Sequence, residues 1–194
     1  MRIEMAGPPA VGKSTLVRTL RERGAKEGVR GDPEKIPKVW RPFAKLILES
    51  YKGTSHETTR VPIKSLEGLA AAWVGDNSED ILVYDELVVL NGFSMAIRYP
   101  DKAPAYFAQA PLPALLVNLY ADIEVLLKRT HKRDSRRGRN DHSGKTIRCV
   151  EAHNRFMPLL EQRGCRIMHF DTGKVNPKEI ADEVLKRAKK IRRK

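Results

Sequence analysis

The sequence has little cysteine and no long apolar run. Only Cys149 and Cys165 occur among 194 residues, and their spacing excludes a zinc-type ligand pair, so we expect free, reduced thiols. No run of about 18 apolar residues is present to span a membrane. No charged start followed by an apolar stretch resembles a signal peptide. These absences favour a cytosolic protein.

Internal repeats and low-complexity linkers are also missing. A chain of 194 residues is the usual size of one α/β domain. We therefore expect residues 1–194 to form a single domain with one core. The length disfavours a motor ATPase.

One nine-residue segment carries most of the functional information. Residues 7–15 match the G-x-x-x-x-G-K-S pattern of a phosphate-binding P-loop, between a strand-like and a helical run. Gly7 and Gly12 permit the turns that aim backbone N–H groups at phosphate, Lys13 reaches the β and γ oxygens, and Ser14 can ligate Mg²⁺. The helix beginning near Lys13 adds its positive end. The expected ATP-binding residues here are Gly7, Pro8, Pro9, Ala10, Val11, Gly12, Lys13, Ser14 and Thr15.

Apolar runs and helical periodicity alternate along the chain. The expected strands cover residues 2–5, 81–84, 115–120 and 166–170. The expected helices cover residues 13–24, 40–51, 63–74, 87–97, 123–131, 145–162 and 177–190. This alternation predicts an α/β fold with a parallel sheet covered on both faces. Residues 24–33 show no obvious strand, 52–60 are expected to be mobile, and 100–113 read as a proline-rich connection.

Two carboxylates follow the second expected strand. Asp85 and Glu86 come directly after the apolar run 81–84, and such a strand delivers its following residues to the carboxyl edge of the sheet. A P-loop phosphotransferase needs one carboxylate near Mg²⁺ and one to receive the acceptor's proton. We assign Asp85 to the metal and leave the base open between the two residues. The alternative for Glu86 is a helix cap.

The net charge of +13 is concentrated in two segments. Residues 128–145 carry +6 and residues 186–194 carry +7, so the rest of the chain is neutral. A basic segment and a basic tail attract polyanions, and nucleic acid is the first candidate partner. Alternatively, the first segment serves only ATP and the second is a solvated helix end.

Arginines dominate the first basic segment. Arg129, Arg133 and Arg136 have helical spacing, and Arg137 and Arg139 flank Gly138. We expect a lid over about 128–145 that orders on ATP binding. In it, Arg129, Arg133 and Arg137 would neutralise the transferred phosphoryl group, and Arg136 would contact ATP.

In this order the motifs resemble the nucleoside and nucleotide kinase branch of P-loop proteins, which includes deoxynucleoside and thymidylate kinases. The resemblance spans nearly the whole chain and rests on the P-loop, Asp85-Glu86, the basic helix with its Arg-Gly-Arg, and the loop 171–173. It implies a P-loop kinase three-layer α/β/α fold, with ATP and Mg²⁺. It also implies that the last loop contacts adenine, through Thr172, Lys174 or Val175.

The sequence departs from this family on the acceptor side. Asp85-Glu86 is followed by Leu87 rather than the Arg typical of free-nucleoside kinases, and no Arg-Glu-Pro element of thymidylate kinases is present. These absences and the basic tail favour an acceptor hydroxyl within a polymer. Bacteriophage enzymes that phosphorylate 5-hydroxymethyluracil in DNA are the example, and they would act in the host cytoplasm.

Candidate acceptor contacts are Trp40, Arg41, Arg60 and Arg98, residue types that stack on bases or bind phosphates. Trp73 is of the same kind but lies on an apolar helical face, which predicts a core position.

The main hypothesis is an ATP-dependent kinase for a hydroxymethylpyrimidine in DNA. One alternative is a free deoxynucleoside or nucleoside-monophosphate kinase, and another is a nucleic-acid-binding ATPase that transfers nothing to an acceptor. A GTPase is disfavoured, because the sequence has no Asn-Lys-x-Asp or Thr-Lys-x-Asp motif.

Overall fold

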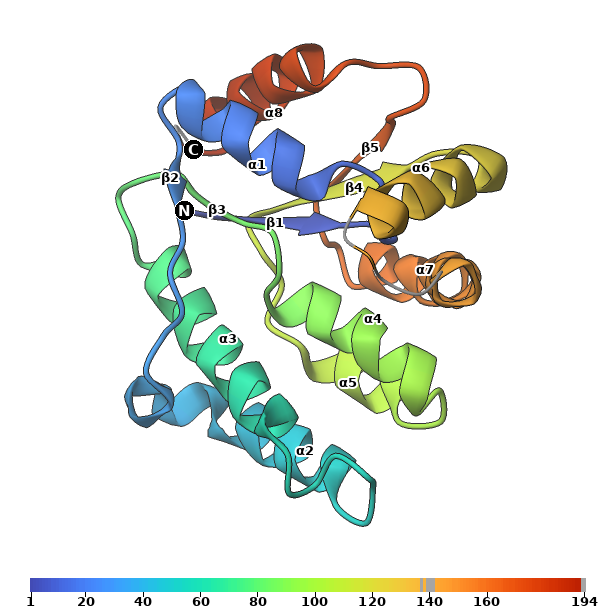
Figure 1. Ribbon diagram of the computed structural model, residues 1–194. Helices are drawn as coiled ribbons and strands as arrows, with labels where there is room; N and C mark the ends of the chain where they lie inside the picture. Colours follow the sequence, from blue (N-terminus) through green and yellow to red (C-terminus); the bar gives the residue numbers. More distant parts are fainter. Residues whose placement is uncertain (137, 139–141, 193–194) are drawn as a thin grey trace.

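The computed structural model of the protein describes residues 1–136, 138 and 142–192. Within that part, five parallel strands form one sheet in the order β2-β3-β1-β4-β5 (Figure 1). The strands are β1 Arg2–Ala6, β2 Lys26–Glu27, β3 Leu82–Tyr84, β4 Leu115–Tyr120 and β5 Ile167–Asp171. The strand that leads into the P-loop is therefore the central one.

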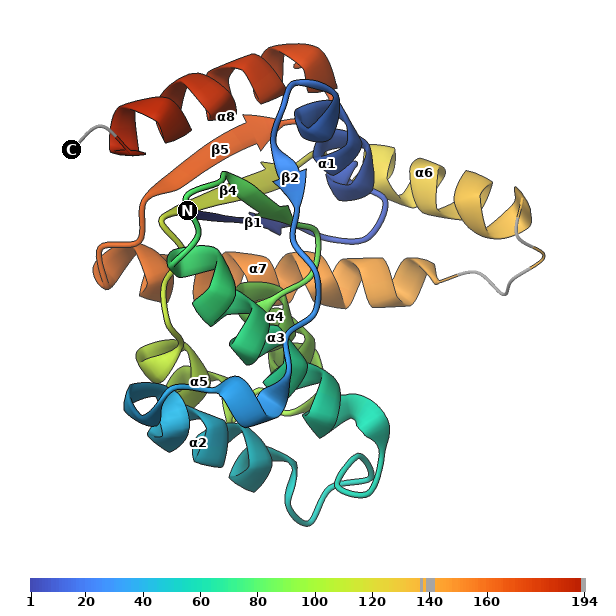
Figure 2. The same cartoon turned by 90° about the vertical axis from the view of Figure 1, so that its left-hand side faces the viewer.

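Helices cover both faces of this sheet (Figures 1 and 2). They are α1 Lys13–Glu22, α2 Arg41–Tyr51, α3 Arg60–Asp76, α4 Val88–Arg98, α5 Ala103–Gln109, α6 Ile123–Arg136, α7 Ser143–Gln162 and α8 Pro177–Arg192. Helices α1 and α8 pack on one face, and α3, α4, α5 and α7 lie on the other, with α2 outside α3 and α5. This is the three-layer α/β/α arrangement that the sequence predicted.

The alternation of side chains along β1 divides the core in two. Ile3 and Met5 belong to the cluster under α1 and α8, whereas Ala6 belongs to the larger cluster under α3, α4, α5 and α7. Leu115 and Val117 of β4 face the first cluster and Leu116 the second. Burial of this strand on both faces explains why Leu115–Val117 reads as a continuous apolar run.

Two charged residues of β1 are buried among these apolar ones. Arg2 is 0% exposed and Glu4 1%. The Arg2 Nε lies 3.4 Å from Glu4 Oε1 and 3.2 Å from Asp76 Oδ1, and Nη2 donates to the Pro111 carbonyl at 2.9 Å. Glu4 Oε2 accepts the Val89 amide hydrogen at 2.8 Å. Because Val89 lies in the first turn of α4, Glu4 caps that helix from the central strand and fixes the chain just after Asp85-Glu86.

The expected elements are mostly confirmed. Each expected strand lies within one residue of an observed one, and the helices agree within three residues except α6, which continues past 131 to Arg136. The prediction missed β2, because its two residues, Lys26 and Glu27, are exposed and polar. It also missed α5 inside the connection 100–113, where a proline at the start of the helix is compatible with helical geometry.

None of the described helices is long and apolar enough to cross a membrane. Both cysteines are free thiols: Cys149 lies on α7, and Cys165 comes just before β5.

Candidate active site

The P-loop turns sharply between β1 and α1. Gly7 has φ +137°, and a Cβ there would lie 2.4 Å from the Leu119 carbonyl oxygen, so no larger residue fits. Gly12 has φ +105° and Ala10 has φ +62°. The chain therefore takes positive-φ conformations at three positions of the loop, a backbone geometry that suits an anion-binding turn.

Lys13 is folded back onto this loop. Its Nζ donates to the carbonyl oxygens of Gly7 at 2.8 Å and Pro8 at 3.1 Å. Burial lowers the pKa of Lys13, while the nearby Asp85 and Glu86 oppose that shift. The Lys13 ammonium group therefore lies against the loop between β1 and α1, and its contact with phosphate stays a prediction.

Ser14 and Asp85 meet across the start of α1. The register pairs Glu4 of β1 with Tyr84 of β3, so Asp85 leaves its strand beside the P-loop. The Ser14 hydroxyl donates to Asp85 Oδ2 at 2.5 Å, and Asp85 Oδ1 is buried without a hydrogen-bond partner among the described residues. A hydroxyl and a carboxylate with a free oxygen are the hard oxygen donors that Mg²⁺ prefers, so the two predicted metal ligands fit that ion.

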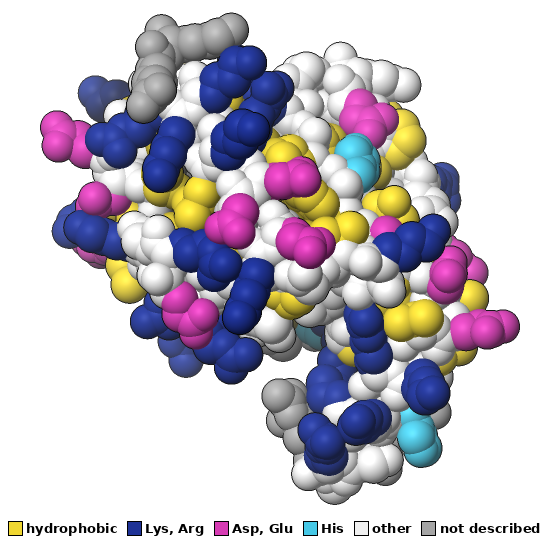
Figure 3. Space-filling view, turned by 90° about the horizontal axis from the view of Figure 1, so that it is seen from above, with side chains coloured by type: hydrophobic (Ala, Val, Ile, Leu, Met, Phe, Trp, Pro, Cys, Tyr) yellow, Lys and Arg dark blue, Asp and Glu magenta, His cyan; other side chains and the backbone are white. Residues whose placement is uncertain are grey.

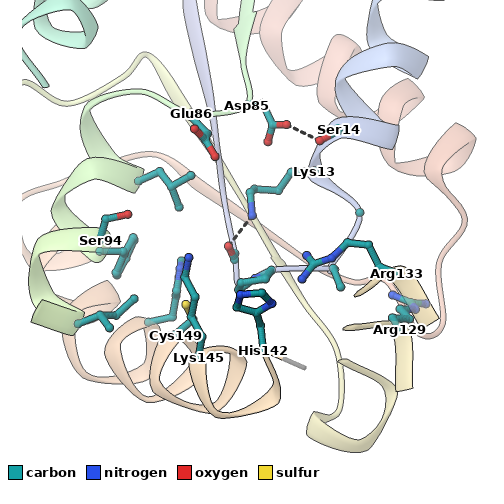
Figure 4. Close-up of a pocket in the computed structure, with 18 of the residues that line it drawn as sticks. Lys13, Ser14, Asp85, Glu86, Ser94, Arg129, Arg133, His142, Lys145 and Cys149 are labelled. Atoms are coloured by element: carbon teal, nitrogen blue, oxygen red, sulfur yellow. Dashed lines mark hydrogen bonds between the residues drawn. The ribbon is translucent and has the colours of Figure 1, made fainter. Parts of the chain in front are cut away.

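Glu86 differs from its neighbour. It is exposed, lines the same pocket, and makes no hydrogen bond or ion pair within the described residues. Figure 4 shows it on the side of Asp85 away from Ser14. This arrangement leaves Glu86 available to a substrate, whereas Asp85 is already engaged.

A pocket of about 950 Å³ extends from the P-loop across to α4 and α7 (Figure 4). Its lining includes Gly7, Pro9, Ala10, Gly12, Lys13, Ser14, Thr15, Asp85, Glu86, Leu90, Phe93, Ser94, Ile97, Arg98, Arg129, Arg133, Asp134, His142, Lys145, Arg148, Cys149 and His153. The pocket therefore contains most of the predicted catalytic groups and a second wall that the sequence did not predict.

Arg133 reaches the pocket from α6 and is fixed by a buried acid. Its Nε lies 2.9 Å from Oδ1 of Asp134, which is 2% exposed. The other oxygen, Oδ2, accepts from the backbone amide of His142 at 3.2 Å and lies 3.1 Å from its Nδ1. The bond from Arg133, helped by His142, lowers the pKa of Asp134 to about 2. Asp134 therefore ties the end of α6 to the residue before α7.

Arg129 hydrogen-bonds to the loop after β5. Its guanidinium donates to Thr172 through Nη1 to the hydroxyl at 3.0 Å and through Nη2 to the carbonyl at 2.9 Å. Arg129 also lines the pocket. These contacts favour a positioning role, because they hold the proposed adenine loop against α6. Lys174 instead lies 3.5 Å from Asp171, and Val175 packs against the core under α1 and α8.

The rest of the predicted lid is only partly described. Arg136 is exposed in the last turn of α6 and does not line the pocket. Arg137 and Arg139 lie outside the described residues, so their roles stay predictions. The same holds for ordering of the lid by ATP.

One of the four predicted acceptor contacts reaches the pocket. Arg98, at the end of α4, lines it. Trp40 does not: its indole packs edge-on against Trp73 with ring centroids 5.5 Å apart, and Arg2 lies over it. Arg41 and Arg60 are exposed at the starts of α2 and α3, away from the pocket lining. These three residues therefore lie outside the pocket lining, and their roles as acceptor contacts stay predictions.

Sequence reasoning missed the wall formed by α4 and α7. Its residues are Leu90, Phe93, Ser94 and Ile97 on α4, and Lys145, Arg148, Cys149 and His153 on α7. They recur three or four positions apart, which is the spacing of one helix face. That periodicity was the only sign of this wall in the sequence, but periodicity alone does not show which face of a helix borders a pocket.

The two basic segments lie far apart. Figure 3 shows Lys and Arg gathered over the end of α8 and over α6, at opposite ends of one face. Met1 shares one core cluster with Ala188 and Ile191, which places the end of α8 at the start of β1. The P-loop follows the other end of β1, so the α8 cluster is not part of the pocket.

No protein-family model matches the sequence, and no curated protein resembles it closely enough to count as a relative. Solved structures do match. Deoxyadenosine kinase from M. mycoides with bound dATP has a TM-score of 0.62 at 12% identity, covering 97% of this chain and 100% of that one. The structure of the same enzyme with dCMP and a flexible dCDP has a TM-score of 0.59 at 14% identity. That match covers 98% of this chain and 100% of the other.

The YorR protein from Bacillus subtilis, in complex with phosphorylated GDP, gives a TM-score of 0.56 at 16% identity. The match covers 97% of this chain and 96% of that one. At such low identity these matches establish the fold, which is that of the P-loop kinases.

Proposed function

We propose that the protein is an ATP-dependent phosphotransferase that moves the γ-phosphate to a hydroxyl of a nucleoside or nucleotide unit. The observation that carries this proposal is one pocket that joins the P-loop to a second wall on α4 and α7. An ATPase or switch needs only the phosphate half. A concave site that continues beyond the phosphates provides room for a second substrate.

The P-loop and its neighbours supply the donor half. The loop amides and Lys13 hold the phosphates, and Ser14 with Asp85 would hold Mg²⁺. When bound, Mg²⁺ would neutralise charge on the phosphates. Arg133, held in place by Asp134, would face the negative charge that builds up during transfer.

Glu86 is our choice for the base, because it is exposed in the pocket and engages no described partner. It would accept the proton of the acceptor hydroxyl. The hydroxyl oxygen then bonds to the γ-phosphorus as the bond to the β,γ-bridging oxygen breaks, and ADP leaves. Asp85 is the weaker candidate, since it is already bonded to Ser14.

The fold matches favour a small acceptor. The matching solved structures are those of deoxyadenosine kinase and of a protein in complex with phosphorylated GDP. They support a free deoxynucleoside or nucleotide as the acceptor over a base in DNA. The basic cluster at the end of α8 was one argument for DNA, beside the missing acceptor-side motifs, and it lies at the far end of β1 from the P-loop. Phosphorylation of hydroxymethyluracil in DNA therefore stays a prediction with weaker support.

Transfer of labelled γ-phosphate from ATP tests the proposal. The acceptors are free deoxynucleosides, deoxynucleoside monophosphates, plain DNA and hydroxymethyluracil DNA. We expect label in a small acceptor and none with the Lys13→Ala variant. Label found only in inorganic phosphate would contradict the proposal and favour an ATPase.

A further inference from the structure

We infer that the acceptor carries a phosphate group of its own, which Arg98, Lys145 and Arg148 bind on the side of the pocket opposite Arg129 and Arg133. The inference rests on the proposed function, since it concerns the second substrate of the same pocket.

Three cations from two helices border this side. Arg98 ends α4, and Lys145 and Arg148 lie one turn apart on α7. All three are exposed. None of them forms an ion pair with another described residue, and Arg98 makes one weak hydrogen bond, from Nη1 to the Ser94 carbonyl at 3.3 Å. Their charges are therefore available to a ligand.

No acid balances this group within the wall. The pocket-lining residues of α4 and α7 include no Asp or Glu. Of the other acids among the described residues that line the pocket, Asp85 is engaged with Ser14 and Asp134 with Arg133. The single free carboxylate among those described residues, Glu86, follows β3 rather than lying on this wall. Like charges that face one space repel each other, and a bound anion relieves that repulsion. Arginine in particular matches the oxygens of phosphate with paired N–H donors.

The phosphates of ATP already have their own partners. They are expected at the P-loop amides and Lys13, with Arg133 on α6 nearby. Figure 4 shows Arg129 and Arg133 on one side of Lys13, and Ser94 and Lys145 on the other. The cations of α4 and α7 therefore face the second substrate rather than the donor.

Uncharged groups complete this wall. Leu90, Phe93 and Ile97 line it, and His153 stacks on Phe93 with ring centroids 3.7 Å apart. Burial, helped by the charge of Lys13, lowers the pKa of His153 to about 3, so the ring is neutral near pH 7. Its Nδ1 is buried and has no hydrogen-bond partner among the described residues. An apolar wall with one neutral polar group suits a base or sugar, and the cations suit the phosphate attached to it.

Calorimetric binding to the full chain tests the inference, with Mg²⁺ and a non-hydrolysable ATP analogue present. The probes are the four deoxynucleosides, the matching 5′-monophosphates and a short oligonucleotide. We expect a monophosphate to bind roughly tenfold tighter or more than its nucleoside, as one charge-assisted hydrogen bond would give. Added salt should weaken the binding of the monophosphate and leave the binding of the nucleoside nearly unchanged.

The double variant Arg98→Gln with Arg148→Gln should lower the affinity for the monophosphate by roughly tenfold to a hundredfold and leave the nucleoside unchanged. The matched control is Arg166→Gln, an exposed arginine before β5 that lies outside the pocket. This control should change neither the affinity for the monophosphate nor that for the nucleoside. Circular dichroism checks that each variant folds, and the salt dependence of the unmodified chain needs no variant.

Four outcomes decide the matter. Equal affinity for nucleosides and monophosphates, or no binding of any phosphate-bearing probe, overturns the inference. Preference for the oligonucleotide that is lost in the double variant supports it and assigns the phosphate to DNA, whereas preference for a monophosphate assigns it to a free nucleotide. Oligonucleotide binding that the double variant does not weaken counts against it. Transfer assays run in parallel separate the two proposals: efficient transfer to nucleosides refutes only this inference, and transfer to no acceptor refutes the proposed function.

Discussion

The two walls of the pocket are built in different ways. The phosphate wall comes from the consecutive residues 7–15 and from Asp85 at the end of the neighbouring strand. The opposite wall comes from scattered positions on α4 and α7, between residues 90 and 153. A contiguous backbone motif specifies the first wall, whereas tertiary packing specifies the second.

The walls also differ in how their polar groups are satisfied. Lys13 bonds to the carbonyls of Gly7 and Pro8, and Ser14 bonds to Asp85. A ligand must replace these internal bonds. Arg98 and Arg148 have no described ion-pair partner to give up. The phosphate wall is therefore preorganised by its own contacts, while the other wall gains contacts only from a ligand.

Replacing Lys13 should have the largest effect, because it removes the charge at the centre of the phosphate wall. We expect Lys13→Ala to reduce transfer at least roughly 10³-fold, the upper range for one lost transition-state donor. Acceptor binding at α4 and α7 should persist. Steady-state transfer with labelled ATP measures the loss, with the exposed Lys64→Ala on α3 as control. Normal turnover by Lys13→Ala would remove the P-loop from the chemistry.

Replacing Glu86 and replacing Asp85 should affect catalysis in different ways. Glu86→Gln should lower kcat roughly 10²- to 10⁴-fold, the usual contribution of a general base, with little change in the Mg²⁺ requirement. The measurement is kcat at saturating ATP, acceptor and Mg²⁺. An unchanged kcat would return the role of base to Asp85.

Asp85→Asn should act through the metal. We expect a loss of transfer that added Mg²⁺ partly restores, because the amide is a weaker ligand than the carboxylate. Titration of activity with Mg²⁺ measures this shift. Ser14→Ala is the companion variant, and it should shift the Mg²⁺ dependence in the same direction. If neither variant changes the Mg²⁺ concentration that activity requires, the assignment of Ser14 and Asp85 to the metal is wrong.

The basic cluster at the end of α8 should affect polymer binding alone. Deleting residues 186–194 would remove the buried Ala188, so charge replacement is the better test. We expect Gln at Lys186, Arg187, Lys189 and Lys190 together to flatten the salt dependence of DNA binding, by up to about one unit of slope per lost phosphate contact. Transfer to small acceptors should be unchanged.

The control for this cluster carries four Gln replacements on exposed lysines around α2 and α3, namely Lys35, Lys38, Lys45 and Lys64. Equal loss of DNA binding in both proteins would mean that net charge, and not the α8 cluster, attracts the polymer. A loss of small-acceptor transfer in the α8 variant would join that cluster to the pocket.

Asp134 should give the smallest effect, seen in stability. Its pKa is about 2 in the folded chain, below the usual value near 4, so its ionised form stabilises the fold. That contribution is present above about pH 4 and fades as the pH falls towards 2. Asp134→Asn should therefore melt at a lower temperature than the unmodified chain at pH 7, and the gap should narrow in acid. A constant gap would mean that the carboxylate charge is unimportant.

The sequence predicted the local features well. The P-loop depends on glycines at positions that need positive φ and on Lys13-Ser14, all of which are adjacent in the chain. The position of Asp85 follows from one rule, that parallel strands end at a common edge. The strands Leu82–Tyr84 and Leu115–Tyr120 were visible as mostly apolar runs.

Features set by tertiary packing were not predictable in the same way. Trp40 has the composition of a base-stacking residue, but its indole is used to pack against Trp73. Glu4 reads as an ordinary strand residue, and only the register between elements shows that it caps α4. The helix faces of α4 and α7 carried the right periodicity, yet nothing local said what they border.

A bridged ligand would test most directly that the two walls form one substrate site. Adenosine joined through a short polyphosphate chain to a deoxynucleoside reaches both walls at once. The account predicts binding roughly 10²-fold tighter than ATP or the monophosphate alone, as expected for two linked sites. Both Lys13→Ala and the Arg98/Arg148 double variant should weaken it. Affinity equal to that of ATP, unaffected by the double variant, would contradict the account.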